Sequence, residues 1–205
     1  MKSIFDFVIT PQNKRYNNTK KIDDVDLIVN TEIQNHKFIS QQAKVLYTPT
    51  AFKTNIKPGD DVIVHHNIFR RWRDVRGEEK NSKSFIDEQT YLCQPDQLYL
   101  YKQNNKWQTQ PGYCFIKPIK NTDKYSLDKE QPLIGIVKYA GDDLNAMGLK
   151  QNDLVGFSPH SEFEFIVDNE RLYRVLLNSI TIKYEYQGQE EEYNPSWLQS
   201  SWWIN

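Results

Sequence analysis

The sequence is poor in cysteine and in long apolar runs. Cys93 and Cys114 are its two cysteines, and neither belongs to a CxxC pair, which excludes a disulfide framework and a zinc ribbon. Both lie in β-like apolar context, which predicts buried, unreactive thiols. No run of about 18 apolar residues occurs, and Asp6 interrupts the short apolar stretch near Met1. We therefore expect a cytoplasmic protein with neither a signal peptide nor a membrane partner.

An excess of charge and the common catalytic motifs are also missing. The 26 basic and 27 acidic residues give a formal charge of −1, so no global field favours nucleic acid or an anionic membrane. GxGxxG, P-loop and GxSxG motifs are absent, which removes the usual templates for phosphate binding and acyl transfer. His65 and His66 are adjacent and would point to opposite faces of a strand. We expect no catalytic residues, no metal and no cofactor.

Strand-forming residues and a repeated order of segments are present. Aromatic residues make up 13% of the chain, which favours an all-β fold. Four kinds of segment occur twice in the same order: an apolar strand ending in proline, a β-prone run, a lysine–aspartate turn with its strand, and an alternating strand. One match could arise by chance, whereas four in order indicate a duplication. The pairs are 7–11 with 114–118, 44–47 with 135–139, 56–64 with 149–157 and 96–101 with 178–183.

The turn at Lys57, Gly59 and Asp60, leading into a hydrophobic strand, resembles that of GroES-type co-chaperonins, the chaperonin 10 fold. Residues 164–175 with 178–180 resemble the last hairpin and final strand of that family, with Asp168–Asn169 as a tight-turn pair. The resemblance covers nearly all of the second copy and the strand skeleton of the first. The duplication and the extra tail are similar to a bacteriophage-encoded form.

The resemblance implies two tandem GroES-like small β-barrel domains with a C-terminal tail. The first domain is expected at 1–103, with a long loop at about 12–42, and the second at 107–186. The polar stretch 102–106 is expected to be a linker. Residues 187–205 form an acidic, Trp-rich tail.

The family resemblance also implies a function. A homo-oligomeric ring of such barrels caps a GroEL-type chaperonin ring, of host or phage, and assists ATP-dependent folding of a client such as a phage capsid protein. Each docking loop inserts a short aliphatic tripeptide into the chaperonin. Residues 13–21 are polar enough to stay disordered, and Leu27, Ile28 and Val29 are the candidate chaperonin-binding triplet. The alternative is that the triplet forms a buried strand. Residues 121–128 are too short for a full docking loop.

Two further segments are candidate interfaces. Arg70, Arg71, Trp72 and Arg73 could stack on bases, but nearby acidic residues dilute the positive field, so a solvated hairpin or a subunit interface is favoured. Trp202 and Trp203 in the tail are expected to dock on the protein's own barrel, with a neighbouring subunit or a partner as alternatives. The rival function is that of a virion structural or adaptor protein, and a nucleic-acid-binding module comes last.

Overall fold

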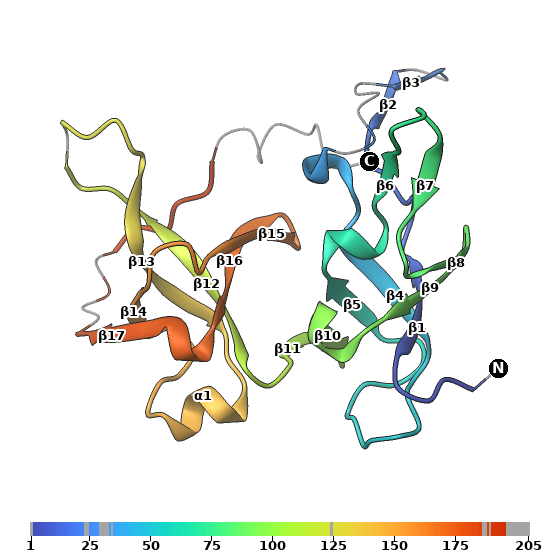
Figure 1. Cartoon of the computed structure of the whole chain (residues 1–205). Coiled ribbons are helices and arrows are strands. Elements are labelled where there is room, and N and C mark those ends of the chain that lie inside the picture. The colour runs from blue at the N-terminus through green and yellow to red at the C-terminus, as the bar shows by residue number, and fades with distance from the viewer. Residues whose placement is uncertain are drawn as a thin grey trace. The chain divides into compact units, whose positions relative to one another are not determined.

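The computed structural model (Figure 1) describes residues 2–22, 25–28, 33, 35–123, 125–185, 188 and 190–195. The fold is all-β, as the composition and the alternating segments predict. The chain divides between Lys106 and Trp107 into two compact units, residues 1–106 and 107–204. Each unit is described by itself below.

One large sheet has the strand order β11-β10-β5-β4-β1-β9-β8, and all of its strands belong to the first unit except β11, which spans the boundary. Neighbouring strands from β8 through β9, β1, β4 and β5 to β10 pair antiparallel. Alternate residues such as Phe7 and Ile9 point into a buried core because strand side chains alternate between faces. The strands of this sheet are β1 (Phe7–Pro11), β4 (Gln42–Tyr47), β5 (Asp61–Val64), β8 (Phe85–Asp87), β9 (Thr90–Cys93), β10 (Leu98–Gln103) and β11 (Lys106–Thr109).

Two small hairpins and three short 3-10 helices are the other elements among the described residues of the first unit. The hairpins interrupt the connections between β1 and β4 and between β5 and β8, and Figure 1 shows both at the same end of the unit. The hairpin strands are β2 (Thr19–Ile22) with β3 (Val25–Ile28) and β6 (Arg71–Arg73) with β7 (Glu79–Asn81), and the 3-10 helices are η1 (His36–Phe38), η2 (His66–Ile68) and η3 (Pro95–Gln97).

The second unit contains a six-stranded antiparallel sheet with the order β15-β16-β12-β13-β14-β17. Cys114, Ile116 and Val137 lie in its core. Its elements are β12 (Tyr113–Lys120), β13 (Glu130–Tyr139), α1 (Asp142–Ala146), β14 (Leu154–Phe157), β15 (Phe163–Val167), β16 (Glu170–Leu176), η4 (Leu177–Ser179) and β17 (Ile180–Tyr184).

The two sheets share one topology. The order β8-β9-β1-β4-β5-β10 in the first unit corresponds strand by strand to β15-β16-β12-β13-β14-β17 in the second. Register shifts also recur at matching places, before Ile9 in β1 and before Ile116 in β12. The repeat seen in the sequence is therefore a repeat of tertiary structure. Among the described strands, pairing closes neither sheet into a barrel.

The lysine–aspartate turn has the same hydrogen bonds in both units. The backbone N–H of Lys57 donates to Asp60 Oδ2 at 2.8 Å, and that of Lys150 donates to Asp153 Oδ2 at 2.8 Å. Gly59 has φ of +93° and its counterpart Asn152 has φ of +72°, a left-handed conformation that glycine and asparagine adopt most readily. The two turns are thus equivalent in backbone as well as in sequence.

The stretch 102–106, expected to be a linker, ends at the boundary between the two units and contains a hairpin turn. Asn104 and Asn105 have φ of 50° and 59° between β10 and β11, the left-handed pair that joins strands in a tight two-residue turn. A short polar stretch has the composition of a turn as well as that of a linker, so composition could not distinguish the two. Asp168 and Asn169 form a similar turn between β15 and β16, with φ of 47° and 63°, which confirms that prediction.

Both cysteines are buried and free. Burial raises the pKa of Cys93 well above its ordinary value, and it raises the pKa of Cys114 to about 12. A thiol with a raised pKa is a poor nucleophile. The prediction of buried thiols is confirmed.

Candidate functional site

The first unit differs from the second mainly in two long connections. One joins β1 to β4 and carries the β2–β3 hairpin, and the other joins β5 to β8 and carries the β6–β7 hairpin. Tyr16 connects them: its Oη donates to the Ile33 carbonyl at 2.7 Å and accepts from the Arg71 N–H at 2.8 Å. The Arg71 guanidinium also lies 4.7 Å from the centre of the Tyr16 ring, within cation–π range. The two additions therefore form one local structure.

Arg15, the residue before Tyr16, also holds the β1–β4 connection against the β5–β8 connection. Its side chain is buried, and Nε donates to the Phe69 carbonyl at 2.6 Å. The guanidinium lies 5.2 Å from the Phe85 ring centre and 5.4 Å from that of Tyr91. Burial lowers the pKa of Arg15, but from so high a starting value that the group stays charged at neutral pH.

These contacts correct the expectation of disorder at the start of this connection. Asn17 N–H donates to the Phe38 carbonyl at 2.7 Å, and Ser40 N–H donates to the Arg15 carbonyl at 3.1 Å. The segment is polar, but Arg15 and Tyr16 find partners in residues far along the chain. Composition alone could not reveal those partners.

Leu27 and Ile28 of the predicted chaperonin-binding triplet are the last two residues of β3, at the open end of the β2–β3 hairpin. Leu27 pairs with Lys20 and Ile28 pairs with Thr19 in an antiparallel register. The Ile28 side chain is 63% exposed. Val29 lies outside the described residues. Leu27 and Ile28 are thus in a strand, as the alternative interpretation predicts, yet Ile28 is not buried.

The Arg/Trp segment forms the β6–β7 hairpin, in which acidic and basic residues pair. Arg71 lies 2.7 Å from Glu79, and Lys80 lies 2.7 Å from Glu78. Trp72 is half-buried, and Arg73 is exposed. Arg70 also contributes its carbonyl, which accepts from Arg15 at 3.3 Å. Since neighbouring carboxylates balance much of the positive charge, the hairpin is a weak candidate for binding phosphates.

Three histidines, one from η1 and two at the start of η2, lie together, which the sequence did not indicate. The ring centres of His65 and His66 are 4.4 Å apart, and those of His36 and His66 are 5.6 Å apart. His65 caps η2 by accepting from Asn67 N–H at 3.0 Å, so the two neighbours do not point to opposite faces as a strand would require. Burial, followed by the charges of His65, His36 and Arg70, lowers the pKa of His66 to about 4. Within the described part of the chain, no group of three ligating residues has the geometry for a metal ion.

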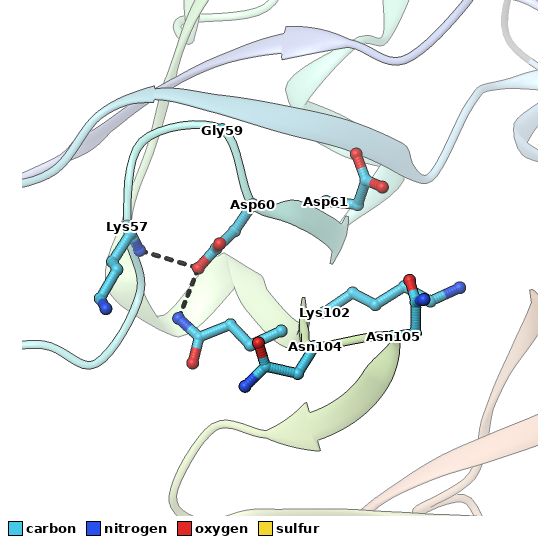
Figure 2. Close-up of a pocket in the computed structure, with 8 residues that line it drawn as sticks. Lys57, Gly59, Asp60, Asp61, Lys102, Asn104 and Asn105 are labelled. Carbon is cyan, nitrogen blue, oxygen red and sulfur yellow. Dashed lines mark hydrogen bonds between the residues drawn. The ribbon is translucent and has the colours of Figure 1, made fainter.

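A small polar pocket of about 350 Å³ lies beside the lysine–aspartate turn of the first unit. Asp60 Oδ2 accepts from the Lys57 backbone N–H, a bond that Figure 2 shows, and from the side-chain amide of Gln103 at 2.7 Å. In the second unit, Lys183 lies 2.7 Å from the corresponding Asp153. Because the aspartate links its turn to β10 in the first unit and to the corresponding strand β17 in the second, we assign it a structural role.

The described part of the tail lies on the second unit. Asn194 Oδ1 accepts from the Arg171 N–H at 3.3 Å, and Tyr193 N–H donates to the Pro118 carbonyl at 2.8 Å. Trp202 and Trp203 lie outside the described residues. Self-docking of the tail therefore applies to residues 190–195, and the tryptophans stay a prediction.

No model of a known protein family matches the sequence, and no curated protein is detectably similar to it. Within the described ranges, no helix has the length and apolar character that crossing a bilayer requires. The hairpins of the first unit remain the strongest candidate for a functional surface.

Proposed function

We propose that this chain is a cytoplasmic co-chaperonin built from two GroES-like small barrels. In this proposal, copies of the chain form a ring that caps a GroEL-type chaperonin and assists ATP-dependent folding of a client protein. The chain acts without catalytic residues or a cofactor. Leu27, Ile28 and Val29 make the contact with the chaperonin.

The observation that carries the proposal is the exposure of Ile28 on a hairpin with a fixed base. The hairpin occupies the connection between β1 and β4, where the family resemblance implies a docking loop. A 63% exposed isoleucine leaves apolar surface in water, and a partner groove would bury it. Arg15 and Tyr16 hold the base in place, so docking orders fewer residues and costs less conformational entropy.

Assembly into a ring would make this small contact sufficient for binding to the chaperonin. One aliphatic triplet buries little surface and binds weakly, and several triplets on one ring bind together through avidity. Weak single contacts allow release during an ATP cycle. The matching connection in the second unit, residues 121–129, is shorter, and its Tyr125 and Leu127 are 97% and 99% exposed. We assign the primary docking role to the longer connection of the first unit.

The test is co-sedimentation of the full chain with a GroEL-type chaperonin, with and without ATP. We expect ATP-dependent binding of the wild type and its loss in the L27S/I28S/V29S variant. The matched control is Y125S/L127S, which removes exposed apolar side chains from the equivalent connection and is expected to keep binding. Circular dichroism checks that each variant is folded.

Two results would overturn the proposal. If the wild type does not bind host or phage chaperonin, the virion structural or adaptor function becomes the better interpretation. If the control loses binding while the triplet variant keeps it, the contact belongs to the second unit. Salt-sensitive binding to nucleic acid, lost when Arg70, Arg71 and Arg73 are neutralised, would instead support the nucleic-acid module.

A further inference from the structure

The tail adds a short strand to an edge of β12. β16 pairs with β12 only from Tyr113 to Ile116, so the rest of that edge lacks a neighbour from the sheet. There the Lys120 N–H donates to the Glu191 carbonyl at 2.7 Å, and the Tyr193 N–H donates to the Pro118 carbonyl at 2.8 Å. Ile119 and Glu192 form an antiparallel bridge. The tail thus satisfies backbone groups that the end of β16 leaves unpaired.

Charge complementarity reinforces this pairing. Lys117 Nζ contacts both Glu170 and Glu192, and Lys120 Nζ contacts Glu191. Lys138 lies 2.9 Å from Glu170. Lys117 and Lys138 share one glutamate of the sheet, Glu170, and Glu192 and Glu191 in the tail bring a further carboxylate to Lys117 and one to Lys120. The edge is therefore complementary to two adjacent carboxylates.

Lys117 is the buried charged residue of this edge, since its side chain is only 7% exposed. Burial by itself would lower the pKa of Lys117, but the hydrogen bonds and charges of Glu192 and Glu170 outweigh burial and raise it. Glu170 belongs to β16 and not to the tail, and its carboxylate contacts the Lys117 ammonium group as well. Asn194 adds specificity next to the edge, since it accepts from the Arg171 N–H at 3.3 Å and its side-chain nitrogen lies 3.5 Å from the Asn169 carbonyl.

We propose that the β12 edge at residues 118–120 is a strand-addition site for an extended acidic peptide, and that residues 190–195 occupy it as a displaceable latch. The site recognises two adjacent carboxylates through Lys117 and Lys120 and an asparagine through the β15–β16 turn. Strand addition supplies affinity through backbone hydrogen bonds, and the side chains supply specificity. An acidic partner gains the site by displacing the tail. This proposal is independent of chaperonin binding.

The test uses the full chain and a fluorescein-labelled peptide, Glu-Glu-Glu-Tyr-Asn-Pro, followed by fluorescence anisotropy. In the E191K/E192K variant, lysines on the tail face Lys117 and Lys120, and the latch should open. We expect the peptide to bind this variant about tenfold tighter than the wild type, because a tethered tail competes at a millimolar effective concentration. A Lys-Lys-Lys-Tyr-Asn-Pro peptide should not bind. Adding K120E to the variant should abolish binding of the acidic peptide.

Hydrogen exchange of the Tyr193 amide checks the latch itself. This amide should be protected in the wild type and exchange freely in E191K/E192K, whose substituted glutamates are at least half exposed. If protection persists in the variant, charge does not hold the latch and the proposal is wrong. If protection is lost but the acidic peptide binds no better than in the wild type, the edge is not a site for acidic segments.

Discussion

The guanidinium of Arg71 lies 4.7 Å from the ring centre of Tyr16, and the Arg71 backbone N–H donates to Tyr16 Oη at 2.8 Å. These two residues belong to the two connections that are longer in the first unit than in the second. The contact makes a single structure of two separate additions to the repeated sheet. A substitution at Tyr16 should therefore destabilise the base of the proposed docking hairpin.

Tyr16→Phe should destabilise the first unit by about 1 to 3 kcal/mol, because it removes the partner of the Arg71 N–H and the donor to the Ile33 carbonyl. Urea unfolding measures the loss. It should be accompanied by faster proteolysis of residues 12–41. Tyr125→Phe is the matched control, since Tyr125 is 97% exposed. Equal stability of both variants would contradict the role of Tyr16.

Gly135→Ala should destabilise the second unit by about 1 to 3 kcal/mol through overpacking. A Cβ at Gly135 would meet Ile116 Cγ2 and the Lys117 carbonyl oxygen at 2.5 Å, and the backbone atom cannot easily move away. Gly156→Ala is a milder control, because its closest neighbour is a Tyr184 side-chain atom at 3.2 Å. Thermal unfolding of both variants gives the comparison. A larger loss for Gly156→Ala would contradict the close approach of β12 and β13.

Acid should weaken the second unit through Asp153. Burial would raise the pKa of Asp153, but Lys183 and the Lys150 backbone N–H outweigh burial and lower it below its ordinary 3.8. The ionised form is therefore favoured by folding. Its contribution is complete above about pH 4 and is lost as pH falls through the lowered pKa.

Asp153→Asn should remove this loss of unfolding free energy at low pH. It should also lower the unfolding free energy at pH 7 by about 1 kcal/mol, because it removes the 2.7 Å ion pair with the half-exposed Lys183. Chemical unfolding at pH 3, 4, 5 and 7 measures both effects. Asp60→Asn is the control, since Gln103 is the side chain that donates to Asp60. The assignment fails if the two variants show the same pH dependence.

His66 should make the first unit sensitive to mild acid. Burial and the neighbouring His65, His36 and Arg70 lower the pKa of His66 from 6.5 to about 4, so folding favours the neutral ring. The unfolded chain takes up the proton first as pH falls. The contribution of His66 is therefore complete above about pH 6.5 and is lost as pH falls towards 4.

A proton NMR titration should give a midpoint near pH 4 for the His66 ring. His66→Gln should remove most of the decline in stability between pH 6.5 and 4. His160→Gln is the control, because His160 lies in the second unit and is exposed. An ordinary midpoint for His66 would mean that the three rings do not pack together in solution.

The sequence by itself determined the all-β fold, the repeated order of strands and the turns. These features depend on neighbouring residues: alternation sets which face of a strand is buried, and the lysine–aspartate spacing places the Lys57 N–H on Asp60. Asp168–Asn169 was predicted as a turn for the same reason, since a two-residue turn needs only two residues that tolerate positive φ. The stretch 102–106 shows the limit, because a polar turn and a polar linker have the same composition.

Only the tertiary structure decided how residues distant in sequence come together. Arg15 is polar and follows a strand, yet Phe85 and Tyr91 bury it. His36 lies beside His66 because η1 and η2 meet, and Glu191 reaches Lys120 because β16 leaves part of the β12 edge free. Each contact joins segments whose pairing is set by the packing of the whole sheet, and no local pattern of residues encodes it.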